Sequence, residues 1–131
     1  MNFNKITPNL VVADIEASLR FYRDVLGFTV SQTVPDKAPF IFAWMKRDDA
    51  ELFLNQQQKP QPGQPDPLAG RQLGGTLSMY MPLKGISDLL KKVEQHGIKI
   101  AIPLHMEFYG MTEFAVLDPD GYLIIFAEPQ E

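Results

Sequence analysis

The chain contains no cysteine, which excludes disulfide bonds, thiol nucleophiles and cysteine-ligated metal sites. It also lacks any apolar run near the ~20 residues that a membrane helix needs. Its N-terminal sequence, MNFNKITPNLVV, has no basic region followed by a long apolar segment, as a signal peptide would. The formal net charge is −4, and the sequence has no stripe of lysine and arginine that could bind the phosphates of a nucleic acid, so broad nucleic-acid affinity is not expected. We therefore expect a soluble cytoplasmic protein with neither nucleic-acid nor membrane partners.

The 131 residues are enough for one ordinary domain with a real core, and 45% of them are hydrophobic. Within this domain the sequence repeats itself. Residues 7–13 are predicted to form a strand, and 14–27 a helix with Asp14 as N-cap and Gly27 as its end. Three more strands are predicted at residues 28–35, 40–47 and 50–57.

About 70 residues later the same order returns, from residue 76 to residue 128. The second set comprises a strand at 76–82, a helix at 86–97 that ends at Gly97, and strands at 98–108, 112–121 and 122–128. The prediction is a single domain, 1–131, of two β-α-β-β-β modules, 1–57 and 74–131. Residues 58–73, rich in proline and glycine, are predicted to be a surface linker or a lid over a site.

Two such modules, the stretch VVADIEASLRFYRDVLGF (11–28) and the ending YGMTEFAVLDPDGYLIIFAE (109–128) resemble the vicinal oxygen chelate superfamily. This superfamily includes glyoxalase I, bleomycin resistance proteins, fosfomycin resistance enzymes and extradiol dioxygenases. The resemblance implies an α+β fold in which two curled mixed sheets form a half-barrel cleft. It does not fix the function, because the scaffold hosts several chemistries.

Enzymes of the family hold a divalent metal in the cleft with His, Glu or Gln. The resemblance places these ligand positions at Thr7, Leu54, Thr76 and Ile125. A threonine hydroxyl is a poor ligand and leucine and isoleucine are not ligands, so we predict no metal and no other cofactor.

Side chains alternate along strands, so residues in step with these positions should also face the cleft. The predicted ligand-binding residues are Asn9, Phe40, Phe42, Trp44, Ser78, Tyr80, His105 and Tyr109. Tyr109, followed by Gly110, matches a place where bleomycin resistance proteins have a ring that stacks on the drug, although it could be an ordinary loop aromatic.

The two histidines and the nearby glutamates give weaker indications of a functional role than the aromatic residues do. His96 at a helix end is expected to serve the helix dipole. His105 could line the cleft, act as a general base or be a lone metal ligand, but no His or Glu partner stands at helical or hairpin spacing to support the last two roles. Glu107 and Glu113 are interpreted as solvated surface residues, and no catalytic residue is assigned.

Taken with the resemblance, these features predict a metal-independent, homodimeric protein that sequesters an aromatic or cationic antibiotic or metabolite, with no assigned catalysis. The alternative is a metal-dependent lyase, isomerase or dioxygenase whose ligands lie elsewhere. A third possibility is a structural or regulatory domain whose cleft is filled by its own side chains.

Overall fold

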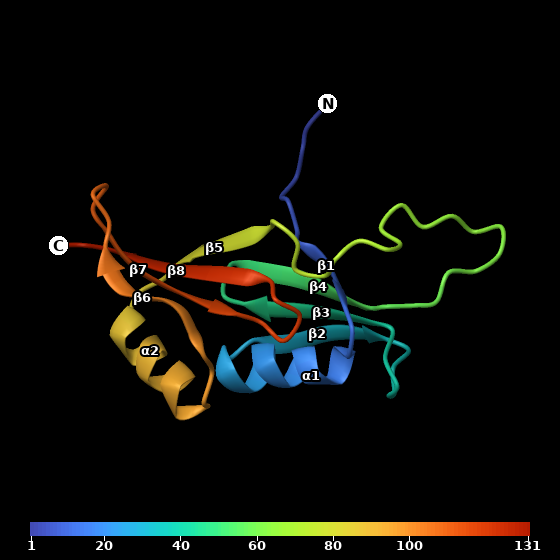
Figure 1. Cartoon of the computed structure of the whole chain (residues 1–131), viewed down its shortest axis with the longest axis horizontal. Coiled ribbons are helices and arrows are strands. Elements are labelled where there is room, and N and C mark those ends of the chain that lie inside the picture. The colour runs from blue at the N-terminus through green and yellow to red at the C-terminus, as the bar shows by residue number, and fades with distance from the viewer. The chain divides into compact units, whose positions relative to one another are not determined.

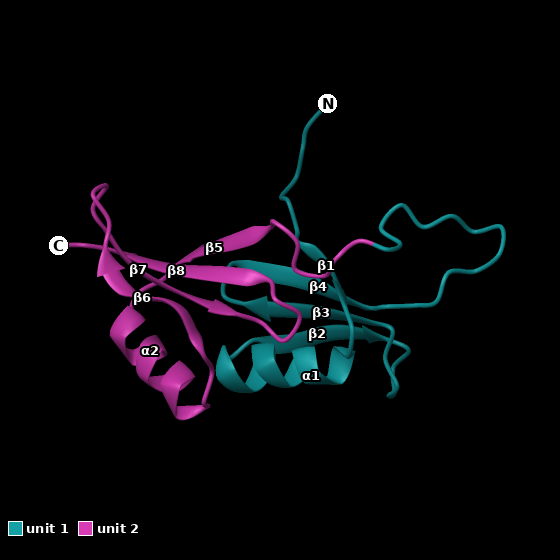
Figure 2. Cartoon of the chain, viewed as in Figure 1, with its two compact units in different colours: residues 1–70 teal, residues 71–131 magenta.

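A computed structural model describes all residues, 1–131. The chain divides into two compact units, residues 1–70 and 71–131 (Figure 2). The first unit contains β1 Asn9–Val12, α1 Ile15–Arg20, the π-helix η1 Phe21–Val25, β2 Thr29–Val34, β3 Phe42–Arg47 and β4 Ala50–Gln56 (Figure 1). The second contains β5 Ser78–Pro82, α2 Ile86–Gln95, β6 Ile100–Met106, β7 Met111–Leu117 and β8 Leu123–Pro129. No helix is long and apolar enough to cross a membrane.

Each unit contains one four-stranded mixed sheet, and the two sheets have equivalent strand orders. The order is β1-β4-β3-β2 in the first unit and β5-β8-β7-β6 in the second. In both, the first and last strands of the unit pair in parallel and the remaining pairs are antiparallel. The predicted α+β chain with two β-α-β-β-β modules is therefore confirmed.

The first helical segment begins as predicted and then departs from regular α-helical winding. The Asp14 side chain caps it by accepting a hydrogen bond from the Glu16 amide at 3.1 Å. Further on, the amide of Leu26 donates to the carbonyl of Phe21, five residues back, at 3.2 Å. Phe21 and Tyr22 are both buried within this wider turn. A repeat of 3.6 residues predicts the helix but not this local winding.

Both helical segments end at a glycine in the left-handed region, as the repeat predicts. Gly27 has φ +73° and Gly97 has φ +71°. A Cβ at Gly27 would lie 2.7 Å from a guanidinium nitrogen of Arg47, whereas a Cβ at Gly97 would meet nothing within 4 Å. The glycines are therefore equivalent in backbone conformation and different in surroundings.

Within each unit, one face of the sheet forms the hydrophobic core. In the first unit α1 packs on β4, and in the second α2 packs on β8. The core side chains of the sheets are Leu10, Val12, Ala43, Met45, Leu52 and Leu54 in the first unit and Met79, Phe114, Val116, Ile124 and Phe126 in the second. The opposite face of each sheet, here called its open face, presents the residues that alternate with these.

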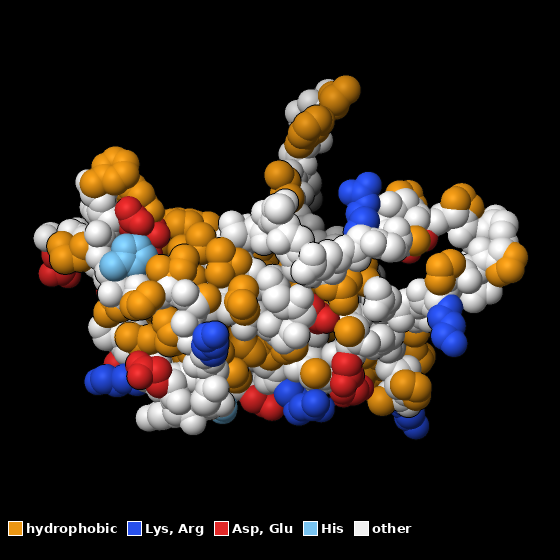
Figure 3. Space-filling view, in the orientation of Figure 1, with side chains coloured by type: hydrophobic (Ala, Val, Ile, Leu, Met, Phe, Trp, Pro, Cys, Tyr) orange, Lys and Arg blue, Asp and Glu red, His pale blue; other side chains and the backbone are white.

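Apolar side chains are also exposed on the segment before β1, which carries hydrophobic surface in Figure 3. Met1, Phe3 and Ile6 are each at least 90% exposed. Such a run of exposed apolar side chains favours contact with another apolar surface.

Candidate functional site

On β4, the residues that lie on the open face are one position away from the residues predicted there. Leu54 is fully buried and lies opposite Leu10 and Ala43 in the strand register, so it belongs to the core. This corrects the prediction that Leu54 faces the ligand side; Leu52, two residues before it, is buried on the same face. Phe53 occupies the open face instead. The module alignment allowed an offset of one residue, and such an offset exchanges the two faces of a strand.

Three aromatic rings gather on this open face. Phe42 and Trp44 of β3 lie with their ring centroids 5.2 and 6.1 Å from that of Phe53. All three are half-buried. Phe40 precedes the strand and is also half-buried. The sheet therefore offers an aromatic surface, in which sequence reasoning missed the central ring.

The edge of the Trp44 ring and its face are both engaged by charged residues. The indole nitrogen donates to Glu51 at 2.8 Å, and the Lys46 ammonium lies 4.3 Å from the ring centroid. Glu51 also pairs with Lys46 at 3.7 Å and with Lys5. The ring thus already makes a cation–π contact, which a cationic ligand stacking on that side would have to displace.

The open face of the second sheet holds a buried carboxylate between two tyrosines. Glu113 of β7 is only 5% exposed. Its Oε2 accepts hydrogen bonds from the hydroxyl of Tyr80 at 2.5 Å and from that of Tyr109 at 2.7 Å. Tyr80 comes from β5, while Tyr109 lies in the turn between β6 and β7, next to Gly110 at φ +88°. Ala127 of β8, opposite Glu113, leaves room for the carboxylate.

The carboxylate holds both hydroxyls in their protonated form. The hydrogen bond to Glu113 raises the pKa of Tyr80 and of Tyr109, with burial as the next cause. Both rings are about half exposed, at 47% and 52%. A molecule on this face would meet two aromatic rings around a concentrated negative charge, a combination that suits a cation.

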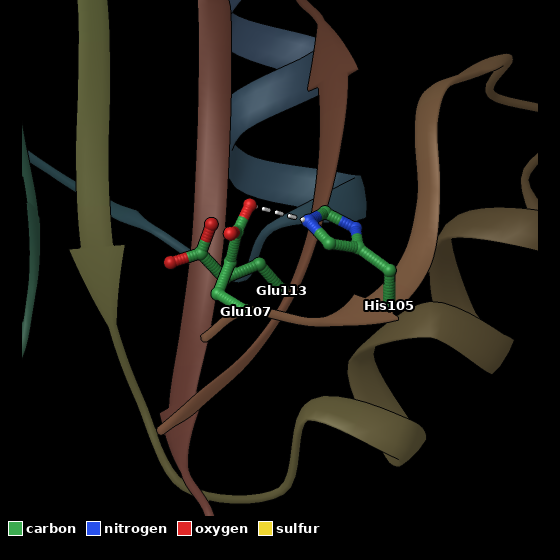
Figure 4. A group of neighbouring side chains, drawn as sticks. All are labelled: His105, Glu107 and Glu113. Atoms are coloured by element: carbon green, nitrogen blue, oxygen red, sulfur yellow. Dashed lines mark hydrogen bonds and ion pairs between the residues drawn. The ribbon is translucent and has the colours of Figure 1, made fainter. Parts of the chain in front are cut away.

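His105 and Glu107 lie beside this carboxylate, as Figure 4 shows. His105 of β6 is directly opposite Glu113 in the strand register. Its Nδ1 donates to the carbonyl of Pro103 at 2.8 Å, and its Nε2 lies 3.0 Å from Oε1 of Glu107. The Pro103 carbonyl and then the Glu107 carboxylate raise the pKa of His105. Both ring nitrogens therefore face oxygen acceptors, an arrangement that favours the protonated ring.

Two of the sequence interpretations need correction here. His105 does have partners at hairpin spacing, because the tight turn after Met106 pairs β6 with β7 and brings Glu113 opposite it. Glu113 is buried, so it is not a solvated surface residue. The sequence did contain a signal for this position. Side chains alternate along a strand, so Glu113 and Ala115 lie on one face of β7 and the buried Phe114 on the other.

The positions where the family's enzymes carry metal ligands do not fit a metal in this chain. Thr7 and Thr76 precede β1 and β5 by two residues, so neither lies on the strand predicted for it. Ile125 on the open face of β8 and Phe53 on that of β4 have no donor atoms. Nearby, the Asn55 amide donates to the Asn9 side-chain oxygen at 2.6 Å, so these two amides bind each other.

The remaining predicted residue, Ser78, begins β5 opposite Leu123 and is exposed. The second unit therefore brings together Tyr80, His105 and Tyr109 of the predicted residues, around an acid that was not predicted. Phe42 and Trp44 form their own group in the first unit. Asn9 lies on the same sheet as that group, paired with Asn55.

Comparison with known proteins covers nearly the whole chain. The family model described as Glyoxalase/Bleomycin resistance protein/Dioxygenase superfamily matches residues 3–126. A bleomycin resistance protein of Geobacillus stearothermophilus is 29% identical over 91% of this chain and 92% of its own length. The virulence protein STM3117 of Salmonella typhimurium is 30% identical over 88% of this chain and 76% of its own length.

Among solved structures, TioX from Micromonospora sp. ML1 superimposes with a TM-score of 0.81 and 15% identity. The match covers 97% of this chain and 99% of TioX. At that identity the similarity concerns the fold alone, and it agrees with the fold class predicted from the sequence.

Proposed function

Because the chain belongs to the glyoxalase/bleomycin resistance protein/dioxygenase superfamily, we propose that it captures a small aromatic or cationic molecule without using a metal. The molecule would be an antibiotic or a metabolite, held by stoichiometric binding and not turned over. The observation that carries this proposal is the buried Glu113 carboxylate between the half-exposed rings of Tyr80 and Tyr109. Charge and ring faces together recognise planar cations.

The four positions Thr7, Phe53, Thr76 and Ile125 support capture without metal, because none of them supplies a ligand that zinc, manganese or iron would select. A pocket for a small molecule needs mainly aromatic walls and a few placed polar groups. Both open faces have this make-up, with aromatic rings beside acids and amides.

Bleomycin is a suitable first probe, since relatives that carry its name are 29% identical to this chain. We expect saturable binding in isothermal titration calorimetry, with one site per chain and unchanged affinity when EDTA is present. A ligand that reaches the first unit should also alter the emission of Trp44, the single tryptophan, by displacing Lys46 from its ring.

Variants on the open face of the second sheet separate the contribution of the aromatic ring to binding from that of the charge. Tyr109→Ala should weaken binding several-fold, because it removes the ring, while Tyr109→Phe keeps the ring and should retain most of the affinity. Glu113→Gln keeps a hydrogen-bond acceptor for both tyrosines but removes the charge, so it should weaken binding of a cation more than of a neutral analogue. Equal affinities for Tyr109→Ala and wild type would contradict the assignment of this face.

We also propose that the protein acts as a homodimer. The exposed apolar segment before β1, with Met1, Phe3 and Ile6, supports a contact with a second copy. Sedimentation velocity should give the mass of two chains, and Phe3→Ser with Ile6→Ser should shift the equilibrium toward one. A monomer at all concentrations would contradict this part of the proposal.

The alternative function is a metal-dependent lyase, isomerase or dioxygenase. One observation favours it, namely the grouping of His105, Glu107 and Glu113, which are residue types that metals bind. Loss of bleomycin binding on addition of EDTA would favour this alternative over metal-free capture.

A further inference from the structure

Three side chains of the second unit converge as the donors of a metal site would. One ligand atom from each of His105, Glu107 and Glu113 lies within 4.8 Å of the other two. They come from the end of β6, the turn after it and β7, and Figure 4 shows the carboxylates and the imidazole turned toward one another. One imidazole and two carboxylates are a donor set that zinc, manganese and iron accept.

The imidazole is oriented for ligation by a bond outside the group. Nδ1 of His105 donates to the backbone carbonyl of Pro103 at 2.8 Å, which fixes the ring and directs Nε2 at the carboxylates. Metal-binding histidines almost always donate their second ring nitrogen to such an acceptor. The ring therefore needs no rotation to present Nε2 to an ion.

The carboxylate of Glu113 is held from outside the group as well. Its Oε2 accepts from the hydroxyls of Tyr80 and Tyr109, and the residue is only 5% exposed. Outer hydrogen bonds of this kind position the carboxylates that ligate metals. No hydrogen bond engages the other oxygen, Oε1, so it is free to serve as a ligand.

The distances suit one ion once the Glu113 side chain moves closer to the other two. Two donors about 2.1 Å from the same ion and at right angles to each other are about 3.0 Å apart. Nε2 of His105 and Oε1 of Glu107 already have this separation, at 3.0 Å. The ligand atom of Glu113 lies within 4.8 Å of the other two, so it needs to approach by up to about 1.8 Å to reach the same separation.

From this geometry we propose that His105, Glu107 and Glu113 form a binding site for one first-row divalent metal ion. The ion takes the place of the Nε2 proton, which leaves to solvent, while the Nδ1 proton stays on the Pro103 carbonyl. Two carboxylates and a neutral imidazole then balance the charge of the ion. The site uses residues of β6, β7 and their turn, and it includes neither Thr76 nor Ile125, the positions at which the family's enzymes place ligands.

This site goes beyond the proposed function, which uses no metal. Capture of bleomycin is measured in EDTA, and metal binding is measured without bleomycin, so either proposal can fail while the other holds. Because an ion and a cationic ligand would both approach the Glu113 carboxylate, bound Zn²⁺ should weaken bleomycin binding.

The test is calorimetric titration of the chelator-treated full chain with ZnCl₂, MnCl₂ and MgCl₂. We expect one Zn²⁺ per chain, weaker Mn²⁺ binding and the weakest response to Mg²⁺, since imidazole favours the later metals of the series. His105→Ala and Glu107→Gln should each weaken Zn²⁺ binding at least about tenfold, because even outer-shell partners are worth 10–100-fold.

His96→Ala is the matched control, because His96 is the second histidine of the chain and lies exposed at the end of α2. It should bind Zn²⁺ as wild type does. In NMR spectra, substoichiometric Mn²⁺ should broaden the ring signals of His105 and spare those of His96. This readout needs no variant and stays informative if a Glu113 variant fails to fold.

No Zn²⁺ binding at millimolar concentration would overturn the proposal. Binding that His105→Ala leaves unchanged, or Mn²⁺ broadening of both histidines alike, would show adventitious association only and would overturn it equally.

Discussion

The corrected face assignment of β4 makes a sharp prediction, because neighbouring residues should respond in opposite ways to truncation. Leu54 is fully buried against Leu10 and Ala43, while Phe53 is half-buried on the open face beside Trp44. Leu54→Ala should destabilise the fold strongly and leave ligand binding intact where the fold survives. Phe53→Ala should cost little stability and disturb the aromatic surface.

The sizes follow from burial. Removing a fully buried leucine side chain costs about 2–5 kcal/mol, through lost transfer energy and the cavity left behind. Full burial of a phenylalanine contributes about 1.5–3 kcal/mol, so a half-buried ring should contribute about 1 kcal/mol. With a urea slope of about 1–1.5 kcal/mol per molar, these costs correspond to midpoint shifts of about 1.3–5 M and about 0.7–1 M.

Trp44 is the natural reporter, because it lies in the same unit as both substitutions and the chain has no other tryptophan. Urea unfolding is followed by Trp44 fluorescence and by far-UV circular dichroism. In the native state, Phe53→Ala should alter the emission of Trp44, whose ring centroid is 6.1 Å away, and Leu54→Ala should alter it less. A larger loss of stability for Phe53→Ala than for Leu54→Ala would refute the assignment of faces.

Three further substitutions test other parts of the structure. Gly97→Ala should cost about 1 kcal/mol in urea unfolding, from the φ of +71° alone since no atom crowds the new Cβ, and a neutral result would contradict the left-handed cap. The pKa of His105, measured by NMR titration, should lie above 6.5, and Glu107→Gln should lower it. The contact between His105 and Glu107 stabilises the folded state at pH values below the unfolded pKa of His105, about 6.5. This stabilisation is lost as the pH rises through the higher pKa of His105 in the folded protein. Ile125→Glu should lower the melting temperature, because it adds a second carboxylate to the face that holds Glu113; an unchanged melting temperature would show that Ile125 does not face this side.

Sequence periodicity was sufficient for the order of helices and strands because it reports which side of each element is apolar, while the curled mixed sheets were implied by the family resemblance. Asp14, Gly27 and Gly97 mark helix boundaries through local backbone chemistry, and the structure places the caps where these residues predict them. Strand ends were less well defined. Thr7 and Thr76 lie outside β1 and β5, because threonine suits both strands and turns.

The faces of the strands were predicted where the sequence alternates clearly. On β3 the alternation of Phe42, Ala43, Trp44 and Met45 assigns the aromatic side chains to one face and the small or aliphatic ones to the other, as the structure has them. On β4, Ala50, Leu52 and Leu54 alternate with Glu51 and Asn55, a pattern that already favours burial of the leucine face. The leucines were misplaced because the module alignment was offset by one residue, and α1 packs against β4 in the structure.

The sequence by itself determined the repeated module and the helix caps, because each depends on residue type and local spacing. The tertiary structure alone decided that Glu113 is buried between Tyr80 and Tyr109 and that His105 and Glu107 lie beside it. These residues come from three strands and a turn, and their proximity depends on the pairing of β5 with β8 and of β6 and β8 with β7. A charge that looks solvated in one strand becomes buried when neighbouring strands supply its hydrogen bonds, and strand pairing is not encoded in local spacing.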